Sequence, residues 1–249
     1  MDDDVLDQRL PECSRELGRT RKLTEDLQAL FLEIQECRKP VVARVHGLAL
    51  GGGVELALAC DYIVATPNAS FGFPETGIGI YPGLGGTQRT TRRIGTGLTK
   101  WLVFTGQIIT AEEALAIGLV DTVAPRDALD AALAKFLAGP PSAERRPGPL
   151  PPAYQKLAAF FDAHDVETIR SGRAETGGDH ALERAAAAVA TKAPVALRTA
   201  ARLIDEGARV SLDEGLRMEV AQVETVFSTA DALTGLLSIG KSRPEFVGR

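Results

Sequence analysis

The sequence predicts an α/β core of largely parallel strands, followed by a region made of helices alone. Short, nearly continuous apolar segments indicate buried strands at 41–45, 61–65 and 70–73. Stretches with helical patterns separate these strands, as in βαβ units. After Pro125 the pattern is helical throughout. We therefore expect an α/β core over residues 1–125 and a helical region over residues 126–249.

Composition excludes several classes of protein. The 249 residues are 45% hydrophobic and 24% charged, which suits a full-sized core. A net charge of -5 disfavours binding to nucleic acid. No apolar run approaches the ~18 residues of a membrane helix, and the start Met1-Asp2-Asp3-Asp4 is unlike a signal peptide. We expect a cytoplasmic protein without membrane contact.

The three cysteines, Cys13, Cys37 and Cys60, are odd in number and widely spaced. They indicate neither a disulfide framework nor a zinc site, and reduced thiols are expected. His164 and His180 lack neighbouring ligands at metal-binding spacing, so we expect them on the surface and expect no metal site.

Before the first strand, the segment Met1–Glu16 is predicted to be irregular because it contains Pro11 and only scattered apolar residues. Residues 23–37 predict an amphipathic helix, which Thr24 would cap. Its apolar face would consist of Leu27, Leu30, Phe31 and Ile34.

After the strands, residues 84–94 predict a helix whose arginines would face solvent near its C-terminus, with ligand binding as the alternative: Arg89, Arg92 and Arg93. Shorter helices are expected at 99–104 and 111–116, the second with a capping box formed by Thr110 and Glu113. Residues 118–123 would form the last strand.

In the C-terminal region, a helix over 126–138 precedes a Pro/Gly-rich insert at 139–153. Its six prolines and two glycines over residues 139–152 predict a loop or polyproline-like linker. Further helices are predicted at 154–164, 166–171, 182–190, 194–207, 212–227 and 230–239.

Candidate chemistry is concentrated between residues 41 and 88. Three glycines, Gly51–Gly53, stand at a helix entrance, where unpaired amides suit an anion or a polarised oxygen. Glu55 follows in the first helical turn, and Glu75 lies in a loop rich in glycine and proline. Two carboxylates beside exposed amides suggest acid/base chemistry on a carbonyl compound. Taken singly, Glu55 could also be a carboxylate that only interacts with the helix dipole, and Glu75 an exposed loop acid.

Other sequence motifs are absent. No phosphate-binding P-loop or G-x-S-x-G nucleophile motif occurs. The glycine-rich segments GIGIYPG and GLGGTQ also fail the dinucleotide-binding pattern.

Three long segments resemble the crotonase (enoyl-CoA hydratase/isomerase) superfamily: VARVHGLALGGGVELALACDY, ASFGFPETGIGIYPGLGGTQR and LTKWLVFTGQIITAEEALAIGLVDTV. The resemblance covers most of the chain from about Leu23 onward. It implies a crotonase-like ββα spiral core and a C-terminal helical region that packs a homotrimer, with two trimers forming a hexamer.

The resemblance also implies a site for an acyl-CoA thioester. Gly52 matches the glycine whose amide contributes to the oxyanion hole, and Gly83 the glycine whose amide helps to hold the reacting water. Glu55 and Glu75 match the two glutamates of the hydratases. No cofactor is implied, because coenzyme A is part of the substrate.

These positions fit the chemistry of hydration. Adding water to a 2-enoyl thioester places negative charge on the thioester oxygen, and an amide at Gly52 would stabilise that charge. Two carboxylates that share one water push their pKa values apart, so one can stay protonated. By the same resemblance, Glu55 would deprotonate water, and Glu75 would donate a proton to Cα.

Two features depart from the family pattern. The segment that supplies a second oxyanion amide would lie at or before Met1, so the chain resembles a member short at its N-terminus. The insert of about 139–178 is longer than usual. Both features resemble the hydratase part of chains that also contain a 3-hydroxyacyl-CoA dehydrogenase, and they suggest association with such a dehydrogenase.

The function expected from the sequence is therefore syn hydration of a trans-2-enoyl-CoA to a 3-hydroxyacyl-CoA, as in fatty acid β-oxidation. The alternatives are an isomerase, a hydratase of branched or dienoyl thioesters, or an inactive homologue. A fourth alternative, an RNA-binding hydratase, is disfavoured by the acidic charge.

Overall fold

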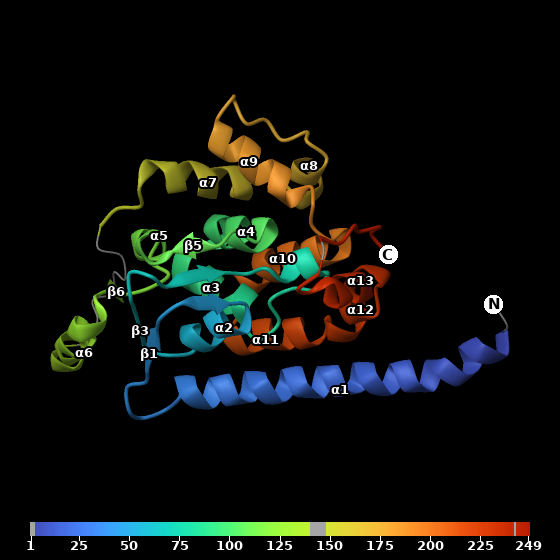
Figure 1. Cartoon of the computed structure of the whole chain (residues 1–249), viewed down its shortest axis with the longest axis horizontal. Helices are drawn as coiled ribbons and strands as arrows, with labels where there is room; N and C mark the ends of the chain where they lie inside the picture. Colours follow the sequence, from blue (N-terminus) through green and yellow to red (C-terminus); the bar gives the residue numbers. More distant parts are fainter. Residues whose placement is uncertain (1–2, 140–147, 242) are drawn as a thin grey trace.

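The computed structural model describes residues 3–139, 148–241 and 243–249, and its elements form stacked layers (Figure 1). The long helix α1 (Asp3–Gln35) runs along one side of the molecule. The strands and short helices of the core lie next to it, and helices α7 to α9 cover the opposite side.

The strands form two small sheets. Strands β1 (Val42–Val45) and β6 (Thr122–Val123) both pair in parallel with β3 (Tyr62–Ala65). In the second sheet, β4 (Ser70–Gly72) pairs in parallel with β2 (Leu48–Leu50) and antiparallel with β5 (Ile109–Thr110). The predicted strands at 41–45, 61–65 and 70–73 are confirmed within one or two residues, whereas β2 and β5 were not predicted.

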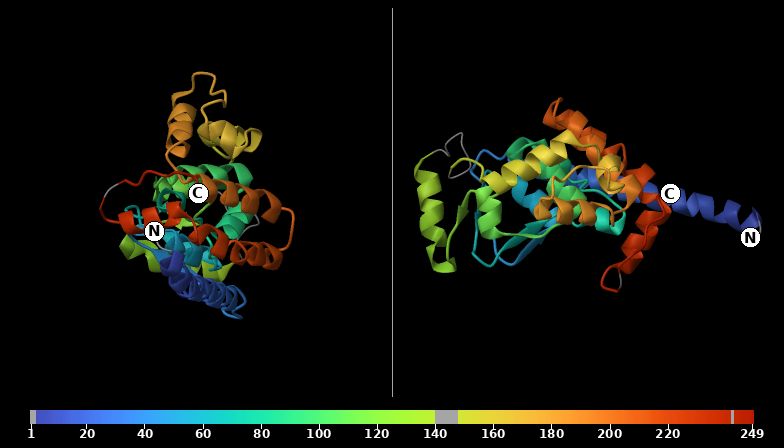
Figure 2. Two further views of the ribbon diagram at one scale, coloured as in Figure 1. Left: turned by 90° about the vertical axis from the view of Figure 1, so that its right-hand side faces the viewer. Right: turned by 90° about the horizontal axis from the view of Figure 1, so that it is seen from above.

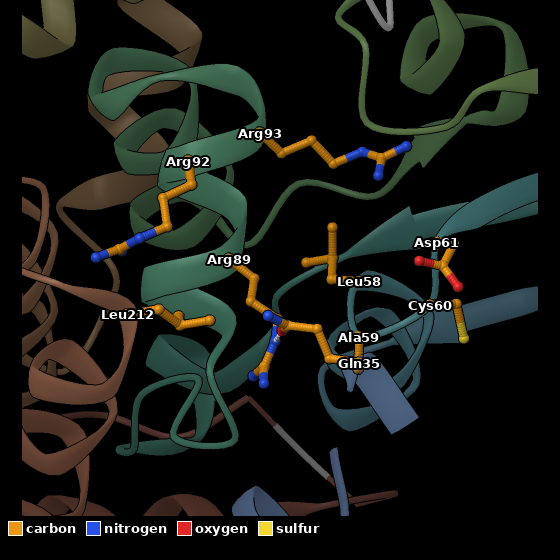
Figure 3. A pocket seen from close by; sticks show the side chains of 9 residues that line it. All are labelled: Gln35, Leu58, Ala59, Cys60, Asp61, Arg89, Arg92, Arg93 and Leu212. Atoms are coloured by element: carbon orange, nitrogen blue, oxygen red, sulfur yellow. Dashed lines mark hydrogen bonds between the residues drawn. The ribbon is translucent and has the colours of Figure 1, made fainter. Parts of the chain in front are cut away.

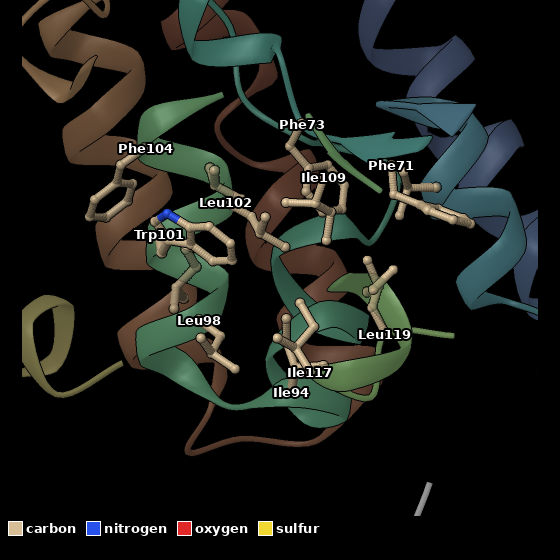
Figure 4. Close-up of a cluster of buried hydrophobic side chains, with 14 of the residues drawn as sticks. Phe71, Phe73, Ile94, Leu98, Trp101, Leu102, Phe104, Ile109, Ile117 and Leu119 are labelled. Carbon is tan, nitrogen blue, oxygen red and sulfur yellow. The ribbon is translucent and has the colours of Figure 1, made fainter. Parts of the chain in front are cut away.

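Short helices connect the strands and carry much of the core. They are α2 (Gly52–Leu58), the 3₁₀ helix η1 (Glu75–Ile78), α3 (Gly86–Ile94), α4 (Thr96–Thr105) and α5 (Ala111–Ala116). Apolar side chains of α4 meet those of β4, β5 and the segment after α5 (Figure 4). The predicted capping box of α5 is present, because Glu113 N–H donates to Thr110 Oγ1 and Thr110 N–H donates to Glu113 Oε2.

The remaining chain is helical, as predicted. A short 3₁₀ helix, η2 (Arg126–Ala128), leads into this region. Its α-helices are α6 (Leu129–Ala138), α7 (Pro152–Ala163), α8 (Val166–Arg170), α9 (His180–Val189), α10 (Pro194–Gly207), α11 (Leu212–Val220), α12 (Val223–Phe227) and α13 (Ala230–Ser238). Most of the predicted linker, residues 140–147, lies outside the described residues, and residues 148–151 carry no helix or strand. Figure 2 shows α6 and the N-terminal part of α1 projecting from the body of the molecule.

The N-terminal predictions need correction. The segment predicted to be irregular is helical from Asp3 onward, although Pro11 removes one backbone donor. Most flanking residues are good helix formers, which favours continuation of the helix. Thr24 is not a cap: it lies within α1, and its hydroxyl donates to Thr20 O. The buried face contains Phe31 but also Thr24 and Gln28, whereas Leu30 is exposed.

The strand predicted at 118–123 is reduced to its last two residues. Gly118 has a φ of 82°, and the amides of Leu119 and Val120 donate back to Ala114 O. The side chains of Leu119 and Val120 are buried. A buried turn therefore gives the same apolar sequence pattern as a buried strand.

The single helix predicted over 212–227 is divided into α11 and α12. The carbonyl of Glu219 accepts a hydrogen bond from Tyr81 Oη (2.6 Å) and another from Gln222 N–H (3.0 Å). In a continuous α-helix this carbonyl would accept from residue 223. The tertiary contact with Tyr81 therefore accompanies the break.

No helix among the described residues is long and apolar enough to cross a membrane.

The structure predicts that α4 carries a large share of the stability. Leu102 is fully buried, and Leu102→Ala should lower the free energy of unfolding by about 2–5 kcal/mol, through lost burial and the cavity left behind. Urea unfolding followed by circular dichroism would measure the change. Leu137→Ala, at a position that is 59% exposed, should change it by less than about 0.5 kcal/mol. Equal effects of the two substitutions would contradict this assignment of the core.

Candidate active site

Glu55 is placed by the glycine cluster at the start of α2. Gly51 precedes the helix with φ 51°, a conformation that favours glycine, and its carbonyl accepts from Val54 and Glu55 N–H. This tight entrance puts the Glu55 side chain in the first helical turn, directed into the protein, and leaves it only 2% exposed. The sequence predicted the turn and its glutamate, but not the depth of burial.

The Glu55 carboxylate is held by backbone amides of the segment that enters α3. Leu84 N–H and Gly86 N–H donate to its Oε1 at 2.7 and 2.8 Å. A Cβ at Gly86 would lie 2.6 Å from that oxygen, so this approach requires glycine. Burial raises the pKa of Glu55 to about 7, against the opposing effect of the two hydrogen bonds and of Arg89. Glu55 can therefore gain or lose a proton near neutral pH.

Glu75 is the first residue of η1 and is 8% exposed. Its Oε1 lies against Gly51, where a Cβ would approach it to 2.3 Å. Among the described residues its buried Oε2 has no hydrogen-bond partner. Burial, and then the neighbouring charge of Glu55, raise the pKa of Glu75 well above its ordinary value. The structure thus brings the two predicted glutamates into electrostatic contact, and burial together with the charge of Glu55 favours the protonated form of Glu75.

The two predicted glycines adjoin these acids. Gly52 is the first residue of α2, and a Cβ on it would contact Leu84 Cδ1 at 3.7 Å. Gly83 precedes the amides that bind Glu55, and its carbonyl accepts from Gln28 Nε2. Within the described part of the chain, neither glycine's N–H donates to a protein acceptor. Both amides are therefore available to a ligand.

A third glutamate, Glu219 on α11, was missed by the sequence reasoning. It is fully buried and accepts hydrogen bonds from Gly85 N–H (2.7 Å), Thr87 N–H (3.1 Å) and Gln28 Nε2 (3.0 Å), and from the Thr87 hydroxyl. Burial, and then the charge of Glu55, raise its pKa to about 8. The signal was present, since Glu219 lies at helical spacing on an apolar stripe: Leu212, Leu216, Val223 and Val226.

Arg89 is the buried cation of this cluster, so the prediction of a solvated arginine face is wrong for it. Its side chain donates to Gln35 Oε1 and to Leu84 O, and its charge acts on both Glu55 and Glu219. Arg93 is also withdrawn from solvent, through an ion pair with Asp121 (2.7 Å). Arginine has a long apolar stem, which allows such burial when its head is paired.

A cavity of about 260 Å³ opens beside these arginines, at the C-terminal end of α2 (Figure 3). Figure 3 shows the three arginine side chains pointing in different directions, with Arg89 toward Gln35. Arg92 instead donates to the carbonyls of Gly207 and Val210. The lining of the cavity includes neither Glu55 nor Glu75, but it shares Arg89 with the glutamate cluster.

The raised pKa of Glu219 predicts a pH-dependent stability. The folded state binds the Glu219 proton up to about pH 8, whereas the unfolded chain releases it near pH 4.5. The contribution of Glu219 to stability is therefore fully present below pH 4.5 and is lost as the pH rises to about 8. Relative to Glu219→Gln, the parent should lose up to about 1.4 kcal/mol of unfolding free energy per pH unit in this window.

Urea unfolding of both proteins between pH 5 and pH 8 would measure this difference. Glu214→Gln, on the exposed side of the same helix, is the matched control and should give no such slope. Parallel pH profiles for the parent and Glu219→Gln would contradict the assignment.

Comparison with known proteins shows which family the chain resembles. The enoyl-CoA hydratase/isomerase family model matches residues 9–139. Crotonyl-CoA hydratase of Syntrophomonas wolfei is 53% identical over 96 residues, which are 39% of this chain and 37% of that protein. Mitochondrial methylglutaconyl-CoA hydratase of Rattus norvegicus is 33% identical over 241 residues, which are 96% of this chain and 61% of that protein. The chain thus spans less than two thirds of the length of these relatives.

Solved structures share the fold. An enoyl-CoA hydratase from Rhodobacter sphaeroides superposes with a TM-score of 0.78 at 21% identity, covering 96% of this chain and 74% of the other. A carnitinyl-CoA dehydratase from Mycobacterium thermoresistibile superposes with a TM-score of 0.74 at 23% identity, covering 96% and 72%. These structures confirm the predicted crotonase-like α/β fold. The family model matches residues 9–139, which are more than half of the chain. The chain therefore belongs to the enoyl-CoA hydratase/isomerase family.

Proposed function

We propose that the protein hydrates a trans-2-enoyl-CoA thioester to the 3-hydroxyacyl-CoA. The observation that carries this proposal is the pair Glu55 and Glu75: both are buried, both have raised pKa values, and they lie beside the unpaired amide of Gly52. Such a pair can take a proton from one atom and give a proton to another at neutral pH.

In this proposal Glu55 is the general base. Its Oε1 is occupied by two amides, and the carboxylate takes a proton from a water held near Gly83 N–H. The water oxygen then bonds to C3 of the substrate, and the π electrons move onto the thioester oxygen. A pKa of about 7 leaves a substantial fraction of Glu55 ionised at neutral pH.

Gly52 and Glu75 complete the addition. The Gly52 amide donates to the enolate oxygen, a kind of contact whose loss typically costs about 10²–10³ in rate. Glu75, which keeps its proton because its pKa is raised, donates that proton to C2. The addition is syn, and the proton taken from water ends on Glu55 while Glu75 becomes ionised.

We extend the proposal to the substrate class, the cofactor, the location of the protein and its assembly. The substrate is an acyl-CoA thioester, coenzyme A is part of that substrate, and the reaction needs no further cofactor. We propose a cytoplasmic homotrimer or hexamer for the active protein, with association to a 3-hydroxyacyl-CoA dehydrogenase, because such an enzyme would use the product.

A branched substrate is the second candidate. The mammalian relative that aligns along 96% of this chain is named methylglutaconyl-CoA hydratase. Hydration of a branched 2-enoyl thioester would use the same acid/base pair. Comparing kcat/KM for crotonyl-CoA and 3-methylglutaconyl-CoA would decide between the two substrate classes.

Substitution of either glutamate should abolish most of the activity. Glu55→Gln and Glu75→Gln keep the side-chain shape but remove the base and the acid, and each should lower kcat by about 10²–10⁴. The loss of conjugated-thioester absorbance with crotonyl-CoA measures the rate. Glu112→Gln, at an exposed position on α5, is the control and should keep parental activity. An unchanged rate of hydration in Glu75→Gln would contradict the two-carboxylate mechanism.

The same assignments predict the pH dependence of kcat/KM. Below about pH 7, Glu55 becomes protonated and cannot act as base, so log(kcat/KM) should rise with unit slope up to that pH. At higher pH it should fall again when Glu75 loses its proton, because burial and the neighbouring charge of Glu55 raise the pKa of Glu75 well above its ordinary value. Initial rates between pH 5 and pH 10 would show the profile, and a flat response across pH 6–8 would contradict the role of Glu55.

A further inference from the structure

The segment that enters α3 is held by two carboxylates through alternate amides. Leu84 and Gly86 donate to Glu55, whereas Gly85 and Thr87 donate to Glu219. The four consecutive N–H groups thus point alternately to two acids that come from different helices, α2 and α11. Each acid is fixed by the same short stretch of backbone.

The conformation of Gly85 permits this alternation. Its φ of 97° is accessible mainly to glycine, and a Cβ at this position would lie 1.9 Å from Arg89 Nη1. Neither the left-handed backbone nor the close guanidinium would admit a larger residue. The backbone of residues 84–87 can therefore direct its amides to both glutamates.

Further contacts fix Glu219 itself. Gln28 Nε2 donates both to Glu219 Oε2 and to Gly83 O (2.8 Å), so α1 connects this acid to the glycine predicted to hold water. Tyr81 Oη donates to the backbone carbonyl of Glu219. The position of Glu219 is thus coupled to residues 83–87 from several directions.

We propose that Glu219 is a positioning residue for Glu55: by holding Gly85 and Thr87, it fixes the two intervening amides that orient the Glu55 carboxylate. Glu219 itself touches no reacting atom in this proposal. Its effect on the reaction rests on the proposed hydratase activity, whereas its effect on the 84–87 backbone does not.

A carboxyl group suits this task because its two oxygens face four donor groups: two amides, the Gln28 amide and the Thr87 hydroxyl. A glutamine side chain keeps only one acceptor oxygen and places an NH₂ group against a backbone N–H. Glu219→Gln should therefore loosen one of the two backbone attachments while keeping the volume of the side chain.

Kinetics with crotonyl-CoA form the first test. Glu219→Gln should lower kcat by about 10–100-fold with KM within twofold of the parent, since a small misplacement of a catalytic group can cost that much. In the Glu55→Gln background, adding Glu219→Gln should lower the residual rate by less than about threefold, because the residue acts through Glu55. Multiplicative losses in the double variant would overturn the proposal.

Hydrogen–deuterium exchange of the free protein forms the second test and does not depend on activity. The amides of residues 84–87 should exchange at least about tenfold faster in Glu219→Gln than in the parent, with α4 unchanged. Glu214→Gln on the same helix is the control and should match the parent in both tests. Unchanged exchange at residues 84–87 would overturn the proposal even if the parent hydrates no thioester.

A milder variant covers the case in which Glu219→Gln fails to fold. Thr87→Val removes the hydroxyl donor to Glu219, together with the acceptor of one hydrogen bond from Gln88 Nε2, and should lower kcat a few-fold, with the same sub-additive behaviour toward Glu55→Gln. Parental kcat in Thr87→Val together with unchanged exchange at residues 84–87 would overturn the proposal. If the parent lacks activity but exchange responds as expected, the proposed function fails while the structural coupling stands.

Discussion

The structure around the candidate site depends on how the backbone of residues 84–87 is satisfied. Its four amides belong to residues that are buried or, in the case of Leu84, half-buried, so each must find an acceptor. Two of them bind Glu55 and two bind Glu219, which joins the start of α2, the entrance of α3 and the C-terminal end of α11. A single stretch of backbone therefore links the α/β core to the C-terminal helical region.

The electrostatics of the site follow from the same arrangement. Glu55, Glu75 and Glu219 are all withdrawn from water, and burial raises the pKa of each. Amide donors and the buried Arg89 offset part of that cost at Glu55 and Glu219, whereas the Oε2 of Glu75 has no hydrogen-bond partner among the described residues. The acids therefore differ in their readiness to ionise, which is what assignment of a separate base and acid requires.

Part of this arrangement was predictable from the sequence, and the reasons are local. The glycine cluster predicted a tight helix entrance, and the apolar runs at 41–45 and 61–65 predicted strands, of which the second is buried and the first only partly buried. By contrast, the buried turn at Leu119 and Val120 has the same apolar pattern as a strand, and the helix at 3–16 continues through Pro11. Such patterns do not show where a backbone hydrogen bond goes, so these segments were assigned wrongly.

The sequence by itself determined the family and the α/β core with its helical C-terminal region, and it predicted Glu55, Glu75, Gly52 and Gly83 as site residues, because these patterns depend on residues close together in the chain. Only the tertiary structure decided that Glu219, 164 positions after Glu55, shares the same amide stretch, and that Arg89 is buried beside both. Burial and partner choice arise when distant helices pack together, and no short segment of sequence contains that information.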